Sequence, residues 1–158
     1  MPVQLSQKER MLLQDQKKHE EICIQKYNQY ANQVQDPQLK QLFQTYAKQE
    51  QQHKDTVNQI LNGQVPQMSQ QQNQQATNQS TGYQAGGQGK MQGAMGNADD
   101  AALCQDMLMT EKFVSGSYDD TIFQFNDSSA RQALNHIQKE EQQHGEGIQQ
   151  YMQQNNLN

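Results

Sequence analysis

The segment KQEQQHK at residues 48–54 returns as KEEQQHG at residues 139–145, and this recurrence decides the fold. Residues 12–60 and 103–151 align without a gap at a constant offset of 91. Each half carries one isolated Glu, followed thirty residues later by Glu-x-x-His. The matched positions are Glu20 with Glu111, Glu50 with Glu141, and His53 with His144. Such self-similarity predicts a chain built from two copies of one structural unit.

Each copy has the signals of two helices joined by a short turn. Ser6 and Glu9 form a capping box, which predicts that the first helix starts there and runs to about residue 34. Asp36-Pro37 reads as an N-cap followed by proline at the first helical position, and Asp127 occupies the matching place in the second copy. The remaining helices are expected to span about 37–61, 97–125 and 128–153.

Residues 62–97 separate the two copies and have no helical periodicity. They contain seven of the ten glycines in a background of Gln and Asn, which predicts a flexible crossover. We therefore expect an all-α, four-helix bundle in one domain over residues 1–158, with antiparallel hairpins at 1–61 and 98–158. A crossover of this length can run along the bundle, so that the second and third helices would point the same way.

The Glu and His residues of the repeat fall on the inward-facing seam of each helix, between apolar side chains. The seam follows alternating steps of three and four residues, and it also includes Lys17, Ile24, Leu108 and Ser115. With a rise of about 1.5 Å per residue, the Glu residues of one hairpin lie at nearly the same height. The sequence therefore predicts one layer that contains Glu20, Glu50, His53, Glu111, Glu141 and His144.

Four carboxylates buried at one level repel one another unless cations lie between them. Two divalent ions balance four Glu and two neutral His, and a four-helix bundle that supplies these ligands is typical of carboxylate-bridged two-metal centres. By the two-fold relation of the copies, Glu50 and Glu141 would bridge the ions, while Glu20 and Glu111 would be terminal. The alternative is a metal-free layer of Glu–His hydrogen bonds and ion pairs.

Ligand hardness favours iron or manganese over copper, because four carboxylates accompany only two imidazoles. The sequence does not separate iron from manganese. Net charge is -5 and no basic run occurs, which argues against nucleic acid and anionic membrane surfaces as partners. No apolar run has the length of a membrane span, and the polar N-terminus lacks a secretory signal.

Other chemically versatile side chains have less specific interpretations. Tyr27 and Tyr118 match across the copies and are core aromatics or phenols that support the metal layer. Cys23 and Cys104 are expected to be buried, reduced thiols, since they form no C-x-x-C motif. His19 and His136 fall off the seam, and both are expected to be exposed to solvent.

The last sixty residues resemble the spore coat protein F family, known as the Coat F domain. The features that carry the resemblance are Asp106, Leu108, Lys112, Tyr118, Glu140, Glu141, Tyr151 and Met152. The first sixty residues join the resemblance through the repeat. It implies a ferritin-like bundle, a spore-forming bacterium, synthesis in the mother-cell cytoplasm and a place in the endospore coat. The full ligand set also looks like that of rubrerythrins and ferritins.

Three functions follow as expectations. The first is a spore coat protein that carries a di-iron or di-manganese centre and associates with other coat proteins or with itself. The second is a di-metal oxidoreductase that destroys peroxide or oxidises Fe²⁺, with electrons from an external donor because the Cys-x-x-Cys relay of a full rubrerythrin is missing. The third is a metal-free structural coat module whose Gln-rich crossover promotes assembly.

Overall fold

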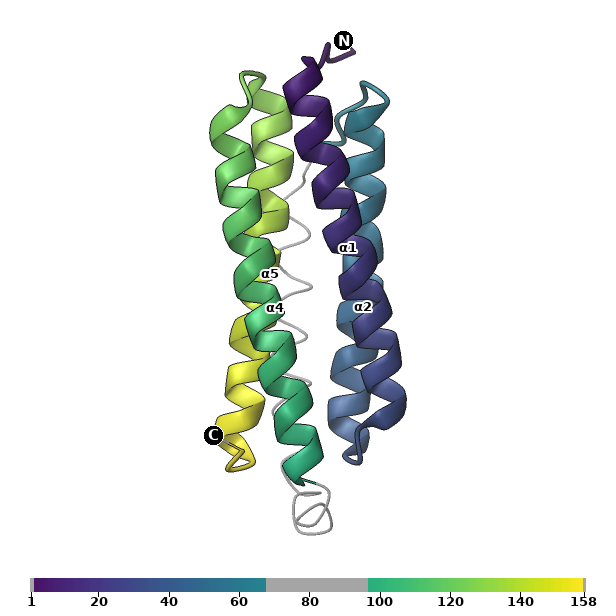
Figure 1. Ribbon diagram of the computed structural model, residues 1–158, viewed down its shortest axis with the longest axis vertical. Coiled ribbons are helices and arrows are strands. Elements are labelled where there is room, and N and C mark those ends of the chain that lie inside the picture. The colour runs from purple at the N-terminus through teal and green to yellow at the C-terminus, as the bar shows by residue number, and fades with distance from the viewer. Residues whose placement is uncertain (1, 68–96, 158) are drawn as a thin grey trace.

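Four long helices lie side by side along the long axis of the molecule (Figure 1). A computed structural model describes residues 2–67 and 97–157 of the chain. Within these residues the helices are α1 (Gln7–Gln33), α2 (Pro37–Leu61), α4 (Asn97–Gln124) and α5 (Ser128–Gln154), and there is no strand. The expectation of an all-α four-helix bundle is confirmed.

The helices form two antiparallel hairpins, α1 with α2 and α4 with α5 (Figure 1). Helix α4 packs beside α1, and α5 beside α2. Helices α2 and α4 point the same way, as the expected long crossover requires (Figure 1). Most of that crossover, residues 68–96, lies outside the described residues, so its flexibility and the single-domain assignment stay predictions. No described helix is long and apolar enough to cross a membrane.

Side-chain caps start the helices where the sequence indicates. Ser6 accepts a hydrogen bond from the backbone N–H of Glu9, and the Glu9 carboxylate accepts one from the backbone N–H of Ser6, which completes a capping box. Asp36 caps α2 ahead of Pro37, and Asp127 caps α5 through the backbone N–H of Ala130. These local signals place the hairpin turns, and the turns set the heights of the residues that follow.

The core consists of two apolar clusters at opposite ends of the bundle. One surrounds Phe43 and Ile148 near the turn between α1 and α2, and the other surrounds Ile60 and Leu134 near the turn between α4 and α5. In all four helices the stretch between the clusters carries a buried Glu, and α2 and α5 add a buried His. The apolar ends therefore enclose a polar middle layer.

The expected seam was wrong at four positions. Lys17 and Ile24 are only half-buried, and their neighbours Gln16 and Cys23 face the core instead. In α4 the same shift by one residue buries Met107 and Val114 in place of Leu108 and Ser115. Steps of three and of four residues both lie near the 3.6 residues of one helical turn, so the pattern does not decide which of two neighbouring residues faces the core. The Gln16 amide tolerates burial because it donates to the hydroxyls of Ser117 and Thr121.

Candidate metal centre

All six predicted site residues lie in the polar middle layer and are almost fully buried. They form two groups whose nearest carboxylate oxygens and imidazole nitrogens lie within 4.8 Å of one another. The first group is Glu20, Glu50, His53 and Glu141, and the second is Glu50, Glu111, Glu141 and His144. Each helix contributes to this layer. Glu50 and Glu141 belong to both groups, as the symmetry of the two copies predicts for a bridging pair.

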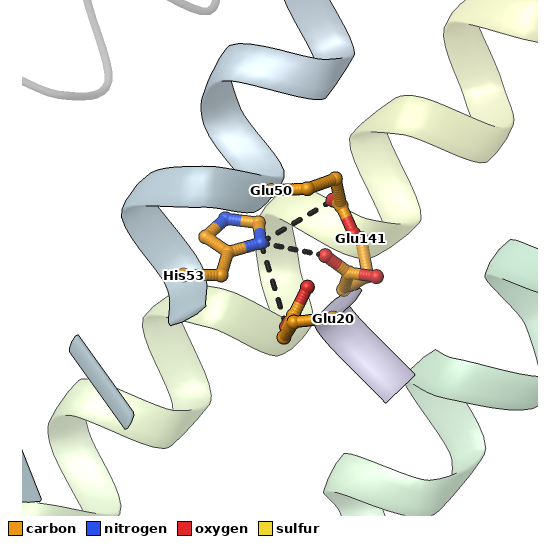
Figure 2. A group of neighbouring side chains, drawn as sticks. All are labelled: Glu20, Glu50, His53 and Glu141. Atoms are coloured by element: carbon orange, nitrogen blue, oxygen red, sulfur yellow. Dashed lines mark ion pairs between the residues drawn. The ribbon is translucent and has the colours of Figure 1, made fainter. Parts of the chain in front are cut away.

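In the first group three carboxylates surround one imidazole nitrogen (Figure 2). His53 Nδ1 lies 2.7 Å from Glu141 Oε1, 3.3 Å from Glu50 Oε1 and 3.8 Å from Glu20 Oε2. Nδ1 and Glu141 Oε1 lack the angle that a hydrogen bond needs, despite their short separation. One nitrogen facing three oxygens from α1, α2 and α5 is an arrangement that a cation can enter.

The second group repeats this arrangement around His144. Its Nδ1 lies 2.9 Å from Glu50 Oε1 and 3.0 Å from Glu111 Oε2. The two imidazole rings are nearly parallel, tilted by 22°, with centroids 5.8 Å apart. Both rings thus direct Nδ1 toward the shared carboxylates, one from each side of the layer.

Buried phenols hold the two carboxylates that belong to only one group. Tyr27 donates a hydrogen bond to Glu111, and Tyr118 donates one to Glu20. Each bond joins one copy of the repeat to the other, and neither was foreseen as a specific pairing. Burial first, and then the charge of the bonded Glu, raises the pKa of both phenols. Each phenol therefore keeps its proton and fixes one oxygen of its Glu.

The shared carboxylates have no such support. Neither oxygen of Glu50 or Glu141 has a hydrogen-bond partner among the described residues. Burial raises the pKa of both groups, and neighbouring Glu charges raise it further. Burial alone would lower the pKa of His53, but the surrounding carboxylates outweigh it and raise that pKa.

The donor set meets the requirements of a pair of divalent cations. Unpartnered buried carboxylate oxygens are costly in a protein interior, and coordination is one of the few ways to satisfy them. Four carboxylates and two imidazoles also match the ligand types that iron and manganese take in bundle cores. Cys23 is close enough to feel the Glu charges, but burial first and then those charges raise its pKa, so it remains a thiol.

The outward nitrogens of the two imidazoles have partners that the sequence analysis missed. His53 Nε2 lies 2.7 Å from Glu140 Oε1 on α5, and His144 Nε2 contacts Gln49 Oε1 on α2. Gln49 and Glu140 each stand immediately before a Glu-x-x-His and match at the offset of 91. That position could have served as the signal, but glutamine is so common here, at 36 residues, that its place in the motif carried little weight.

His136 is largely buried beside Glu140, which corrects the expectation of solvent exposure. Its Nε2 lies 3.5 Å from Glu140 Oε2 across one helical turn. Burial opposes the charged form of Glu140, but the nearby imidazoles of His136 and His53 outweigh it and lower the pKa of that carboxyl. His19 is also half-buried, with its ring edge-on to Phe113. The thiols of Cys23 and Cys104 are free and buried, as expected.

Among the described residues, a phenol ring stacks on one imidazole, that of His144, and none stacks on His53. Tyr46 stacks on His144 with centroids 4.2 Å apart and an angle of 25°. Gly147 permits this placement, because a Cβ there would come within 1.9 Å of the Tyr46 hydroxyl oxygen. The position that matches Tyr46 in the other copy is Ile137. The two halves of the layer therefore share their inner residues but differ around them.

Comparisons with known proteins identify two families. Residues 11–88 match the Rubrerythrin family model, and residues 99–157 match the Coat F domain model. No curated protein and no solved structure gives a significant match. The rubrerythrin match includes Glu20, Glu50 and His53, while the Coat F match includes the other three residues of the layer. The first part of the chain is thus similar to rubrerythrin and the last part to the Coat F domain, and the rubrerythrin match fits the four-helix, ferritin-like bundle.

Proposed function

We propose that this protein is a spore coat component that binds two divalent ions, iron or manganese, in its middle layer. Glu50 and Glu141 would bridge the ions. One ion would also take Glu20 and His53, and the other Glu111 and His144. The Coat F match over residues 99–157 supports the place in the coat, and association with other coat proteins or with itself follows from that place.

The observation that supports the metal assignment most strongly is that the carboxylates of Glu50 and Glu141 are buried without hydrogen-bond partners among the described residues. The carboxylate oxygens of Glu50 and Glu141 are buried, lack hydrogen-bond partners among the described residues, and lie in both groups of potential ligands. A hydrogen-bonded layer without metal would be expected to satisfy such atoms. Two divalent cations would neutralise four carboxylates and remove both the repulsion and the unmet coordination.

The residues around the ions have distinct tasks under this proposal. Tyr27 and Tyr118 orient the terminal carboxylates by donating to Oε2, and Oε1 of each carboxylate has no hydrogen-bond partner among the described residues. The acceptors at the outer Nε2 atoms keep a proton there, so that the Nδ1 lone pairs face the centre. The apolar clusters at both ends keep bulk water out of the layer.

Elemental analysis of the purified chain tests this assignment. Protein produced in medium rich in iron or manganese should contain about two ions per chain, and the dominant element identifies the metal. Glu50→Ala removes a bridging ligand and should empty at least one position, whereas Lys48→Ala, an exposed neighbour on α2, should leave the content unchanged. A chain that stays metal-free in both media, or equal content in Glu50→Ala and the parent, would reject the ligand set.

A second candidate is a di-metal oxidoreductase, favoured by the match of residues 11–88 to rubrerythrin. A bridged pair of iron or manganese ions can exchange electrons with peroxide or O₂. The chain's own contribution would be a dry site, fixed ligands and protonated phenols at Tyr27 and Tyr118. Electrons for peroxide reduction would come from an external donor.

Activity assays on metal-loaded protein separate the two candidates. Peroxide consumption with an added reductant, and Fe²⁺ oxidation under O₂, should both exceed the rate of metal-free protein if the centre turns over. His53→Ala provides the control, because it removes one imidazole ligand. If metal-loaded protein consumes peroxide and oxidises Fe²⁺ no faster than the control, the oxidoreductase function is rejected and the metal-binding coat function stands.

A further inference from the structure

The two halves of the middle layer differ in the group that holds each imidazole. In the His53 half the acceptor at Nε2 is a carboxylate, Glu140, at 2.7 Å. In the His144 half the acceptor at the matching position is the amide of Gln49. The inner residues are the same in both halves, namely one terminal Glu, one His and two shared Glu. The outer acceptor is therefore a chemical difference between two sites that share their inner residues.

Glu140 is itself held in place. Its side chain is only 13% exposed and its second oxygen lies 3.5 Å from His136 Nε2. His136 reaches it from one turn earlier on α5, while His53 approaches from α2. At the offset of 91 the His136 position is Thr45, so the Gln49 side has no matching imidazole. Glu140 is thus contacted by imidazoles from two helices, α5 and α2, in the His53 half of the layer.

A carboxylate and an amide act differently on a ligating imidazole. Hydrogen bonding from Nε2–H to a carboxylate shifts electron density toward Nδ1 and makes the ring a stronger donor to a metal. A neutral amide oxygen orients the ring equally well but polarises it less. Glu140 also adds a negative charge near the His53 half, which further favours a cation there.

We infer that Glu140 is a positioning and tuning residue that makes the His53 half the tighter of two unequal metal positions, so that it fills first. This inference rests on the proposed di-metal function. Loss of an outer partner of a metal-bound imidazole typically weakens binding by about 10–100-fold, which sets the expected difference between the halves. The residue pair Glu140 and Gln49 would be the determinant of the order of loading.

Single-histidine variants isolate the halves. His144→Ala keeps His53 with Glu140, and His53→Ala keeps His144 with Gln49. Each full-length, metal-free chain is titrated with Co²⁺, using the visible absorption of the coordinated ion as the readout and circular dichroism melting to verify the fold. His144→Ala should bind Co²⁺ about 10–100-fold more tightly than His53→Ala.

Exchange of the outer residue then assigns the cause. Glu140→Gln in the His144→Ala chain should remove the advantage, and Gln49→Glu in the His53→Ala chain should create one. Equal affinities in the two single-histidine chains, or an advantage that survives Glu140→Gln, would overturn the inference. If the parent chain binds two Co²⁺ while these variants are equal, only the inference fails. If the parent binds none, the proposed di-metal function fails with it.

Discussion

The two ends of the bundle differ from its middle layer in the kind of side chain that they bury. The ends contain apolar side chains such as Phe43 and Leu134, which are fully buried and need no partner beyond their neighbours. The middle layer buries four carboxylates and two imidazoles at the same depth, and its central oxygens have no hydrogen-bond partner among the described residues. The ends therefore supply stability, and the middle gives up stability for the cation binding that we propose.

The largest expected effect is a test of the apolar ends. Phe43→Ala should lower the free energy of unfolding by about 3–5 kcal/mol, because Phe43 is fully buried and packs against Tyr27 with ring centroids 5.4 Å apart. Urea denaturation followed by circular dichroism measures the change. Phe123→Ala is the control: its side chain is 75% exposed, so the loss should stay within about 0.5 kcal/mol. Equal losses would mean that the ends are not packed as described.

The second prediction adds metal to the middle layer. A free Mn²⁺ concentration 100 times the dissociation constant should stabilise the chain by about 2.7 kcal/mol, because only the folded state assembles the layer. Calorimetry with and without Mn²⁺ measures the shift in Tm. Phe43→Ala should keep this increment, whereas Glu50→Ala should lose most of it. An increment retained in Glu50→Ala would place the ion elsewhere.

A third, smaller effect concerns the phenols that clamp the layer. Tyr118→Phe removes the hydrogen bond to Glu20 and leaves a buried carboxylate oxygen unsatisfied, at a cost of about 1–3 kcal/mol. Tyr27→Phe should cost less through Glu111, because His144 Nδ1 lies 3.0 Å from the oxygen that Tyr27 would release, whereas His53 Nδ1 is 3.8 Å from the Glu20 oxygen. Chemical denaturation of metal-free protein measures both. Tyr30→Phe is the control, because Tyr30 bonds to Asp106 at the half-buried surface of α4. If Tyr30→Phe lowers the free energy of unfolding as much as the other two substitutions do, the phenols of the middle layer are not specially important for stability.

The stability of the metal-free protein should depend on pH through the titratable groups of the middle layer, and not through the apolar ends. The native pKa values of Glu50 and Glu141 are raised above the ordinary 4.5, and that of His53 is raised above 6.5. Stability from their protonated forms is fully present below those ordinary values and is lost as the pH rises through the native ones. Metal-free protein should therefore become less stable from about pH 5 to 8, by at most about 1.4 kcal/mol per pH unit for each proton.

Calorimetry in EDTA at several pH values measures this decline. Glu50→Gln should flatten it, because a neutral amide cannot lose the proton, while Phe43→Leu in the apolar end should keep it. Groups with lowered pKa values, such as Glu140 and Asp106, act in the opposite direction only at acid pH, where stability falls as they are protonated. Stability that rises steadily toward pH 8 without metal would contradict the account of the middle layer.

The sequence predicted the helices and the composition of the layer because both depend on local, strongly patterned signals. Ser6, Asp36 and Asp127 act on backbone groups within three residues, so the caps could be read directly. The layer followed from the recurrence of Glu-x-x-His with an isolated Glu thirty residues earlier. These features need no knowledge of how side chains pack.

The rest depends on contacts between helices, which periodicity does not specify. Burial of Gln16 depends on Ser117 and Thr121 on α4, so its amide entered the core where the neighbouring Lys17 was expected. The pairing of His53 with Glu140 joins α2 to α5 and depends on their relative rotation. Such rotations follow from how the side chains of all four helices interlock.

Anomalous scattering from crystals grown with iron or manganese tests the central claim most directly. Two peaks are expected inside the bundle, both bounded by Glu50 and Glu141, with His53 at one and His144 at the other. A well-ordered crystal with no peak in this layer after soaking, or with ions only at surface carboxylates, would contradict it.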